Sequence, residues 1–139
     1  MAHTLSFQKL TPNLIVENVE RSLAFYVEVL GFTRGLTVPD ESPFVFASVV
    51  SGNVEIFFND KSTAVKEYPS FAATPIGLTG TMYIETTGVD AWHERLKSKA
   101  RIVMPLVTQF YGVREFAFAD PDGYVITFAE RVGADPASA

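Results

Sequence analysis

The sequence predicts an α+β fold built from two similar halves, and three observations support this. In each half, alternating apolar residues typical of a strand give way to an apolar repeat with helical period. Further strand-like runs follow each helix. Matching positions also lie 70 residues apart in a chain of 139, as Thr11 and Thr81 do. A repeat at half the chain length indicates duplication of one structural unit.

The first half begins with a strand and a helix. Apolar positions alternate along the first segment, at Leu10, Pro12, Leu14 and Val16, which is the pattern of a strand. Asn18 is a suitable N-cap for the helix that follows, and Gly31 suits the position after its end. Between these two residues, one face of the helix carries the apolar side chains of Leu23, Tyr26, Val27 and Leu30. The later runs "FVFASVV" and "NVEIFFND" are predicted to be strands.

The second half repeats this plan. Alternation recurs at Met82, Ile84 and Thr86, and one helical face then carries Val89, Trp92 and Leu96. Basic residues follow where a helix C-terminus favours them, at Lys97, Lys99 and Arg101. The runs "REFAFAD" and "YVITFAE" are joined by Asp-Pro-Asp-Gly at 120–123, a sequence suited to a type I turn. Each half is therefore predicted as a strand, a helix and three strands.

These patterns predict one domain over residues 1–139. Its parts are a first module at 9–59, a linker at 60–80, a second module at 81–131 and a flexible tail at 132–139. A linker of this length in so small a domain is expected to carry function or to pack against a partner.

Composition restricts the function classes. The chain has no cysteine, which excludes disulfides, thiolate nucleophiles and cysteine-ligated zinc or iron–sulfur sites. A net charge of −5 without a basic cluster opposes binding to nucleic acid or to an anionic membrane and favours cationic or neutral ligands. The N-terminal segment has neither a charged leader nor a long apolar run, so we expect a soluble cytoplasmic protein.

Two segments resemble a known superfamily. Residues Pro12, Leu14 and Val16 followed by "SLAFYVEVLGF", and later "YGVREFAFADPDGYVITF", are similar to the glyoxalase, bleomycin-resistance and extradiol-dioxygenase (vicinal oxygen chelate) superfamily. The bleomycin-resistance branch is the most similar, and the resemblance spans about residues 9 to 131. It implies a duplicated fold of two βαβββ modules, whose curved mixed sheets enclose a cavity, in a homodimer. Because the superfamily includes enzymes and binding proteins, the fold leaves the chemistry open.

The resemblance implies where a divalent metal would be held. The corresponding positions in this chain are Thr11, Glu55, Thr81 and Thr127. Threonine hydroxyls are poor substitutes for imidazole and carboxylate ligands. The two histidines lie in the leading tail, His3, and within the second helix, His93, where packing is the expected role. We therefore expect no metal, no cofactor and no catalytic residue.

If the four positions point inward, alternation predicts a binding surface beside them. The residues predicted to bind a ligand are Asn13, Phe46, Glu55, Phe57, Tyr83, Glu85, Phe110, Tyr111, Arg114 and Thr127. The opposite strand faces, which include Val16, Ile56, Phe58, Ile126 and Phe128, are predicted to lie under the helices. Two alternatives remain. Glu55 and Glu85 have a structural alternative, in which each is paired with Arg114 or with water. The adjacent aromatics Phe110 and Tyr111 have another, in which one belongs to the core and the other covers a dimer contact.

The preferred hypothesis is a metal-free, dimeric binding protein that sequesters an antibiotic or drug-like compound, one that is cationic or aromatic. The alternative is a metal-dependent lyase, isomerase or dioxygenase of the same superfamily that uses Glu55 as one ligand. A third hypothesis is a regulatory domain whose pocket has no ligand.

Overall fold

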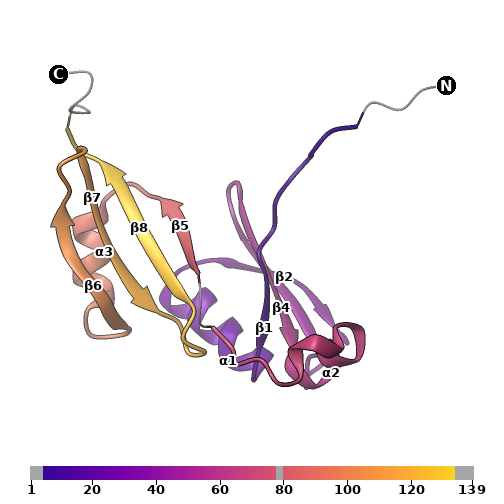
Figure 1. Ribbon diagram of the computed structural model, residues 1–139. Helices are drawn as coiled ribbons and strands as arrows, with labels where there is room; N and C mark the ends of the chain where they lie inside the picture. The colour runs from indigo at the N-terminus through magenta and orange to yellow at the C-terminus, as the bar shows by residue number, and fades with distance from the viewer. Residues whose placement is uncertain (1–4, 78–79, 134–139) are drawn as a thin grey trace. The chain divides into compact units, whose positions relative to one another are not determined.

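The computed structural model describes residues 5–77 and 80–133. It contains two four-stranded mixed sheets, each accompanied by a helix on one face (Figure 1). The chain divides into two compact units between Ala72 and Ala73. Within each unit a strand, a helix and three strands follow one another. The predicted α+β fold of two βαβββ modules is confirmed.

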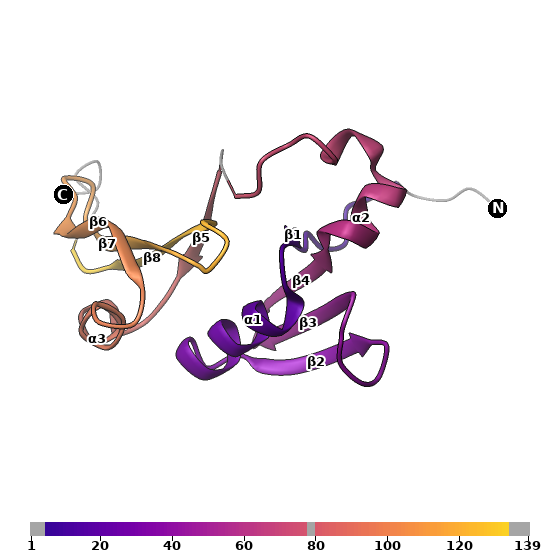
Figure 2. The same ribbon diagram turned by 90° about the horizontal axis from the view of Figure 1, so that it is seen from below.

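The first unit contains a sheet in the order β1-β4-β3-β2, in which β1 is parallel to β4 and the other pairs are antiparallel. Helix α1 lies along one face of this sheet (Figure 2). The elements are β1 (Asn13–Val16), α1 (Val19–Ala24), the π-helical turn η1 (Phe25–Val29), β2 (Thr33–Val38), β3 (Phe46–Ser51), β4 (Val54–Asp60), α2 (Lys61–Glu67) and the 3₁₀ turn η2 (Pro69–Phe71).

The second unit contains a sheet in the order β5-β8-β7-β6, again with one parallel pair, β5 and β8. Its elements are β5 (Thr81–Glu85), α3 (Val89–Leu96), β6 (Arg101–Thr108), β7 (Val113–Ala119) and β8 (Val125–Arg131). Throughout residues 5–77 and 80–133, no helix has the length and apolar character needed to cross a membrane.

The first helix begins and ends where the sequence predicts. The Asn18 side chain accepts a hydrogen bond from the Arg21 N–H at 2.8 Å, which satisfies one of the free donors of the first turn. Gly31 follows the last helical turn with a φ of +83°, a conformation that glycine adopts without steric cost. The Tyr26 ring is fully buried, and its centroid lies 4.8 Å from that of Phe58 on β4.

The N-terminus of helix α3 is capped by a side chain of strand β8. Its N-cap residue, Gly88, has no side chain to cap the helix. The Glu130 carboxylate on β8 instead accepts hydrogen bonds from the N–H groups of Gly88 and Val89, both at 3.0 Å. These hydrogen bonds hold the pKa of Glu130 below its ordinary value, because they favour the ionised carboxylate.

The helix-side faces of both sheets form the core, as predicted. The side chains of Ile56, Phe58, Ile126 and Phe128 are at most 3% exposed. Trp92 of α3 packs against Phe128 with ring centroids 5.2 Å apart. The His93 ring meets a phenylalanine of β7, Phe116, at 5.1 Å, so this histidine is a packing residue.

The loop between β7 and β8 forms the predicted turn. The Gly123 N–H donates to the Asp120 carbonyl at 3.0 Å, which closes the turn. The Asp120 side chain accepts from the N–H groups of Asp122 and Tyr124, both at 2.9 Å. A Cβ on Gly77 would lie 2.7 Å from the Asp122 carbonyl oxygen, so the chain before β5 passes closely over this turn.

The sequence pattern does not locate β2, β6 or α2. The pairing of β2 shifts register between Arg34 and Thr37, and β6 contains two such shifts. A register shift interrupts the alternation by which a strand is recognised. Helix α2 occupies part of the segment predicted to be a linker, and the Asp60 side chain caps it by accepting from the Thr63 N–H at 3.2 Å.

The strand register also changes one sequence correspondence. Asn13 lies opposite Phe57 in the first sheet, and Tyr83 lies opposite Thr127 in the second. Thr127 is therefore the register counterpart of Phe57. Comparison of the last strands of the two halves by sequence alone instead matches Thr127 with Glu55, 72 residues earlier. Such a comparison contains no information about which residues face each other in a sheet.

The Glu130 cap predicts a pH-dependent contribution to stability. A lowered folded-state pKa stabilises the fold above the ordinary glutamate value, and this stabilisation is lost as pH falls through the folded-state pKa. We expect Glu130→Ala to lower the Tm at neutral pH by several degrees, and the difference from wild type to shrink in acid. Thermal unfolding followed by circular dichroism measures both.

Glu94→Ala is the matched control, because Glu94 of α3 forms an exposed ion pair with Lys97, the residue after the helix, and such pairs contribute little. Equal Tm values for Glu130→Ala and Glu94→Ala at neutral pH would contradict the cap.

Candidate functional site

The face of the first sheet opposite α1 carries four of the residues predicted to bind a ligand. Asn13 on β1 lies opposite Phe57 on β4, and Phe46 on β3 lies opposite Asn59. The rings of Phe46 and Phe57 meet edge to face, with centroids 5.2 Å apart. Asn59 donates a side-chain hydrogen bond to Asn13. Glu55, two residues before Phe57, shares the same face, which is therefore partly aromatic and partly polar.

The positions that the family resemblance assigns to a metal do not suit one. Glu55 forms an ion pair with Lys9. The hydroxyls of Thr81 and Thr127 are hydrogen-bonded to each other at 2.9 Å. Across the described part of the chain, no three histidine, cysteine, aspartate or glutamate side chains are grouped so that they could hold a metal ion. Because this donor set lacks imidazole and clustered carboxylates, the residues present do not fit a divalent metal.

On the second sheet, a row of three residues crosses the face opposite α3. Glu85 on β5 lies opposite Ala129 on β8, which in turn lies opposite Glu115 on β7. Since neighbouring strands are about 4.8 Å apart, the two glutamate backbones are separated by roughly 10 Å. The adjacent row consists of Tyr83, Thr127 and Ala117. Ala129, a small residue, thus lies between the two longer glutamate side chains.

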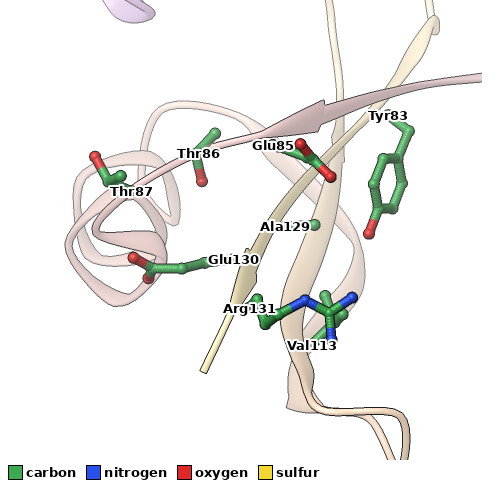
Figure 3. A pocket seen from close by; sticks show the side chains of 8 residues that line it. All are labelled: Tyr83, Glu85, Thr86, Thr87, Val113, Ala129, Glu130 and Arg131. Carbon is green, nitrogen blue, oxygen red and sulfur yellow. The ribbon is translucent and has the colours of Figure 1, made fainter. Parts of the chain in front are cut away.

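A pocket of about 390 Å³ opens at one end of this row. The residues that line it are Tyr83, Glu85, Val113, Ala129, Glu130 and Arg131, together with Thr86 and Thr87 between β5 and α3. Figure 3 shows the Tyr83 ring, the Glu85 carboxylate and the Arg131 guanidinium around Ala129, while Glu130 points away from them. The pocket therefore combines an aromatic ring, both signs of charge and a small-residue floor.

Glu115 is a buried carboxylate beside this floor. It is 6% exposed, and its Oε1 accepts hydrogen bonds from the Tyr111 hydroxyl at 2.9 Å and from the Gln109 amide at 3.2 Å. Its other oxygen, Oε2, is buried and has no hydrogen-bond partner among the described residues. Buried carboxylate oxygens ordinarily have a donor, so this atom requires an explanation.

The carboxylates change the titration of two tyrosines. Partial burial, followed by the negative charges of Glu115 and Glu85, raises the pKa of Tyr83, while Arg131 opposes the rise. The hydrogen bond to Glu115 is the largest cause of the raised pKa of Tyr111, because that bond requires the tyrosine proton. Both tyrosines therefore lie within the electrostatic field of Glu115.

The turn between β6 and β7 presents the two adjacent aromatics. The Gln109 N–H donates to the Val113 carbonyl at 2.8 Å, and the Gly112 N–H donates to the Gln109 carbonyl at 3.0 Å. Phe110 at the tip is 86% exposed, and its ring centroid lies 5.0 Å from that of Tyr111. The turn thus places one ring in solvent and the other over Glu115.

Arg114 lies on the opposite side of β7 from Glu115, because successive strand residues alternate in direction. Its guanidinium donates to the Asp90 carboxylate of α3 at 2.9 Å and to the Thr108 hydroxyl at 2.8 Å. Arg114 is therefore bound at the helix side, where it pairs with neither Glu55 nor Glu85.

Eight of the ten predicted ligand-binding residues thus form two groups, while Phe110 lies at the turn tip and Arg114 on the helix side. One lies on the first sheet, with Asn13, Phe46, Glu55 and Phe57, and the other on the second, with Tyr83, Glu85, Tyr111 and Thr127. Sequence reasoning missed Glu115, Gln109 and Arg131. The alternation in "REFAFAD" contains a signal for the first of these, because it places Glu115 on the face away from Phe116 and Phe118.

Comparison with known proteins identifies a family and a shared fold. The family model of the Glyoxalase/Bleomycin resistance protein/Dioxygenase superfamily matches residues 2–128. No curated protein sequence matches the chain significantly.

Several solved structures have a similar fold. A glyoxalase/bleomycin resistance protein/dioxygenase from Nocardioides is 23% identical, with 96% of this chain and 90% of that chain covered and a TM-score of 0.74. TnmS3, an antibiotic binding protein from Streptomyces sp. CB03234, is 23% identical, with coverages of 93% and 99% and a TM-score of 0.72. TioX from Micromonospora sp. ML1 is 18% identical, with coverages of 91% and 100% and a TM-score of 0.71.

The coupling of the two tyrosines to Glu115 is testable without a ligand. We expect Glu115→Gln to lower the pKa of both Tyr83 and Tyr111, with the larger change at Tyr111, whose hydroxyl bonds directly to the carboxylate. Glu85→Gln, as a matched control, should lower the pKa of Tyr83 and leave Tyr111 nearly unchanged. NMR titration with labelled tyrosine rings measures these values. An unchanged Tyr111 pKa in Glu115→Gln would contradict the described hydrogen bond.

Proposed function

Because the chain belongs to the Glyoxalase/Bleomycin resistance protein/Dioxygenase superfamily, we propose that it is a small-molecule-binding protein that sequesters an antibiotic or drug-like compound. The observation that carries this proposal is the chemistry of the positions where a metal would be expected. Three are threonines, and the single carboxylate, Glu55, is already paired with Lys9. Such a set supports binding by shape, stacking and hydrogen bonds, without a metal.

The surfaces opposite the helices support a ligand of this class. The first sheet offers the paired rings of Phe46 and Phe57 beside the Asn13 side chain. The second offers Tyr83 and the pocket beside it. Aromatic walls with a few separated polar groups are characteristic of sites for drug-sized molecules. TnmS3 is described as an antibiotic binding protein, and this ligand class is part of our proposal for the present chain.

We further propose that the protein acts as a cytoplasmic homodimer. The segment before β1 carries three apolar side chains, Leu5, Phe7 and Leu10, each more than 90% exposed. Exposed apolar side chains grouped in one segment are typical of a surface that a partner covers.

Ligand titration tests the binding function. We expect a panel of aromatic antibiotics, including a bleomycin-type glycopeptide, to contain compounds that quench tyrosine fluorescence saturably. For such a compound, Tyr83→Ala should weaken binding about tenfold, which corresponds to about 1.4 kcal/mol and is a typical contribution of one stacked ring. Tyr68→Ala is the matched control, since this exposed tyrosine is the C-cap of α2 and is not among the residues that line the pocket beside Tyr83. Saturable binding by no compound would contradict the proposal.

Metal analysis of protein purified without chelator tests the alternative. We expect substoichiometric Zn, Fe, Mn and Ni. A stoichiometric metal that Glu55→Gln releases would contradict metal-free binding and favour a metal-dependent lyase, isomerase or dioxygenase that uses Glu55 as a ligand.

A further inference from the structure

We propose that the ligand carries a protonated nitrogen, an amine, amidine or guanidine group, and that Glu115 Oε2 is the acceptor that anchors it. This inference rests on the proposed small-molecule binding function and specifies the chemical class of the ligand. It also assigns a binding role to a residue outside the set predicted from the sequence.

The burial of Glu115 is the first argument. Its side chain is more than nine-tenths buried, and Oε2 has no donor among the described residues. An ionised carboxylate only accepts hydrogen bonds, so each buried oxygen is stabilised by a donor. A buried charged oxygen without one is destabilising, and this cost is relieved when a binding partner supplies the donor.

The orientation of the carboxylate is the second argument. Tyr111 and Gln109 both donate to Oε1, so the group is held in one orientation while the buried Oε2 has no donor among the described residues. A carboxylate fixed in this way can form a directed bond with little further loss of side-chain freedom. The two donors come from the turn between β6 and β7, which also carries the exposed Phe110 ring.

The surrounding charges favour a cation. Glu85 lies in the same row as Glu115, on the other side of Ala129. Burial for Tyr83 and the hydrogen bond to Glu115 for Tyr111 are the largest causes of their raised pKa values, and the negative charge of Glu115 adds to both. Arg131 is the opposing positive group, and its side chain is exposed at the pocket edge, where solvent weakens its effect.

The aromatic rings add a second form of recognition. Tyr111 bonds to Glu115, its ring contacts that of Phe110, and Tyr83 feels the charge of the same carboxylate. The faces of such rings attract cations. A protonated amidine or guanidine is flat, so it can stack on a ring while its N–H groups bond to a carboxylate. A neutral compound of the same shape would keep the stacking and lose the charge-assisted hydrogen bond.

A matched pair of probes tests the inference. Benzamidine and benzamide have nearly the same shape, and only benzamidine is cationic at neutral pH. In NMR titrations of wild-type protein, we expect benzamidine to bind about tenfold more tightly than benzamide, and the Glu115 side-chain carboxyl ¹³C signal to move with benzamidine. Glu115→Gln should remove this preference, whereas Glu85→Gln, at the more exposed carboxylate, should reduce it only slightly.

The outcomes separate this inference from the proposed function. Equal binding of both probes to wild type, no binding of benzamidine, or an unmoved Glu115 carboxyl signal would overturn the inference. These wild-type measurements decide the matter even if Glu115→Gln does not fold, which thermal unfolding reports. If the antibiotic panel binds wild type and Glu115→Gln equally, the inference fails while the proposed function stands. If neither the panel nor benzamidine binds, both fail.

Discussion

The packing of one helix against one face of each sheet is the constraint on which the rest of the structure depends. Once α1 and α3 cover one side, alternation sends every second strand residue to the other side. The buried side needs large apolar groups, and Phe58 and Phe128 supply them. The other side is free of this requirement, so its polar and aromatic residues are available for function. The division between core and candidate site is therefore set by strand period and helix packing together.

Strand β8 shows how closely the two sides are coupled. Ile126, Phe128 and Glu130 face α3, where the first two pack in the core and the third caps the helix. Thr127, Ala129 and Arg131 face the pocket side. A shift of one residue in the register of β8 would exchange these two sets. The helix cap and the pocket floor are thus positioned by the same backbone hydrogen bonds.

Features that depend on neighbouring residues can be predicted from this sequence, whereas features that depend on residues distant in the chain cannot. Asn18 and Gly31 act through neighbouring backbone groups, and Ile126 and Phe128 through strand period, so local sequence predicts them correctly. Strand β2 is not predicted from the sequence, because it contains Gly35. This glycine packs closely against Ser48, where a Cβ would lie 2.4 Å from the hydroxyl oxygen, and that contact depends on a residue distant in the sequence. The structural equivalence of Thr127 in the second sheet and Phe57 in the first likewise depends on strand register, which residue similarity does not encode.

The same contrast between local and distant contacts applies to the candidate site. Tyr83, Glu85 and Thr127 follow from alternation, whereas the importance of Glu115 depends on partners brought to it by the fold. Gln109 and Tyr111 lie six and four residues away in sequence, and only the turn after β6 folds them over the carboxylate. Arg114, which directly precedes Glu115, is bound by Asp90 of α3, a contact that no local pattern contains.

Glu115 also shows how stability and binding can be distinguished at one position. Its neighbours on the same face of β7 are Val113 and Ala117, both apolar and buried, so an apolar residue at 115 would satisfy the sheet. The packing of this sheet face therefore does not call for a carboxylate, and the acceptor role of Glu115 is confined to Oε1, which Tyr111 and Gln109 use. Its second oxygen has no such role among the described residues, and a ligand donor is the role that we propose for it.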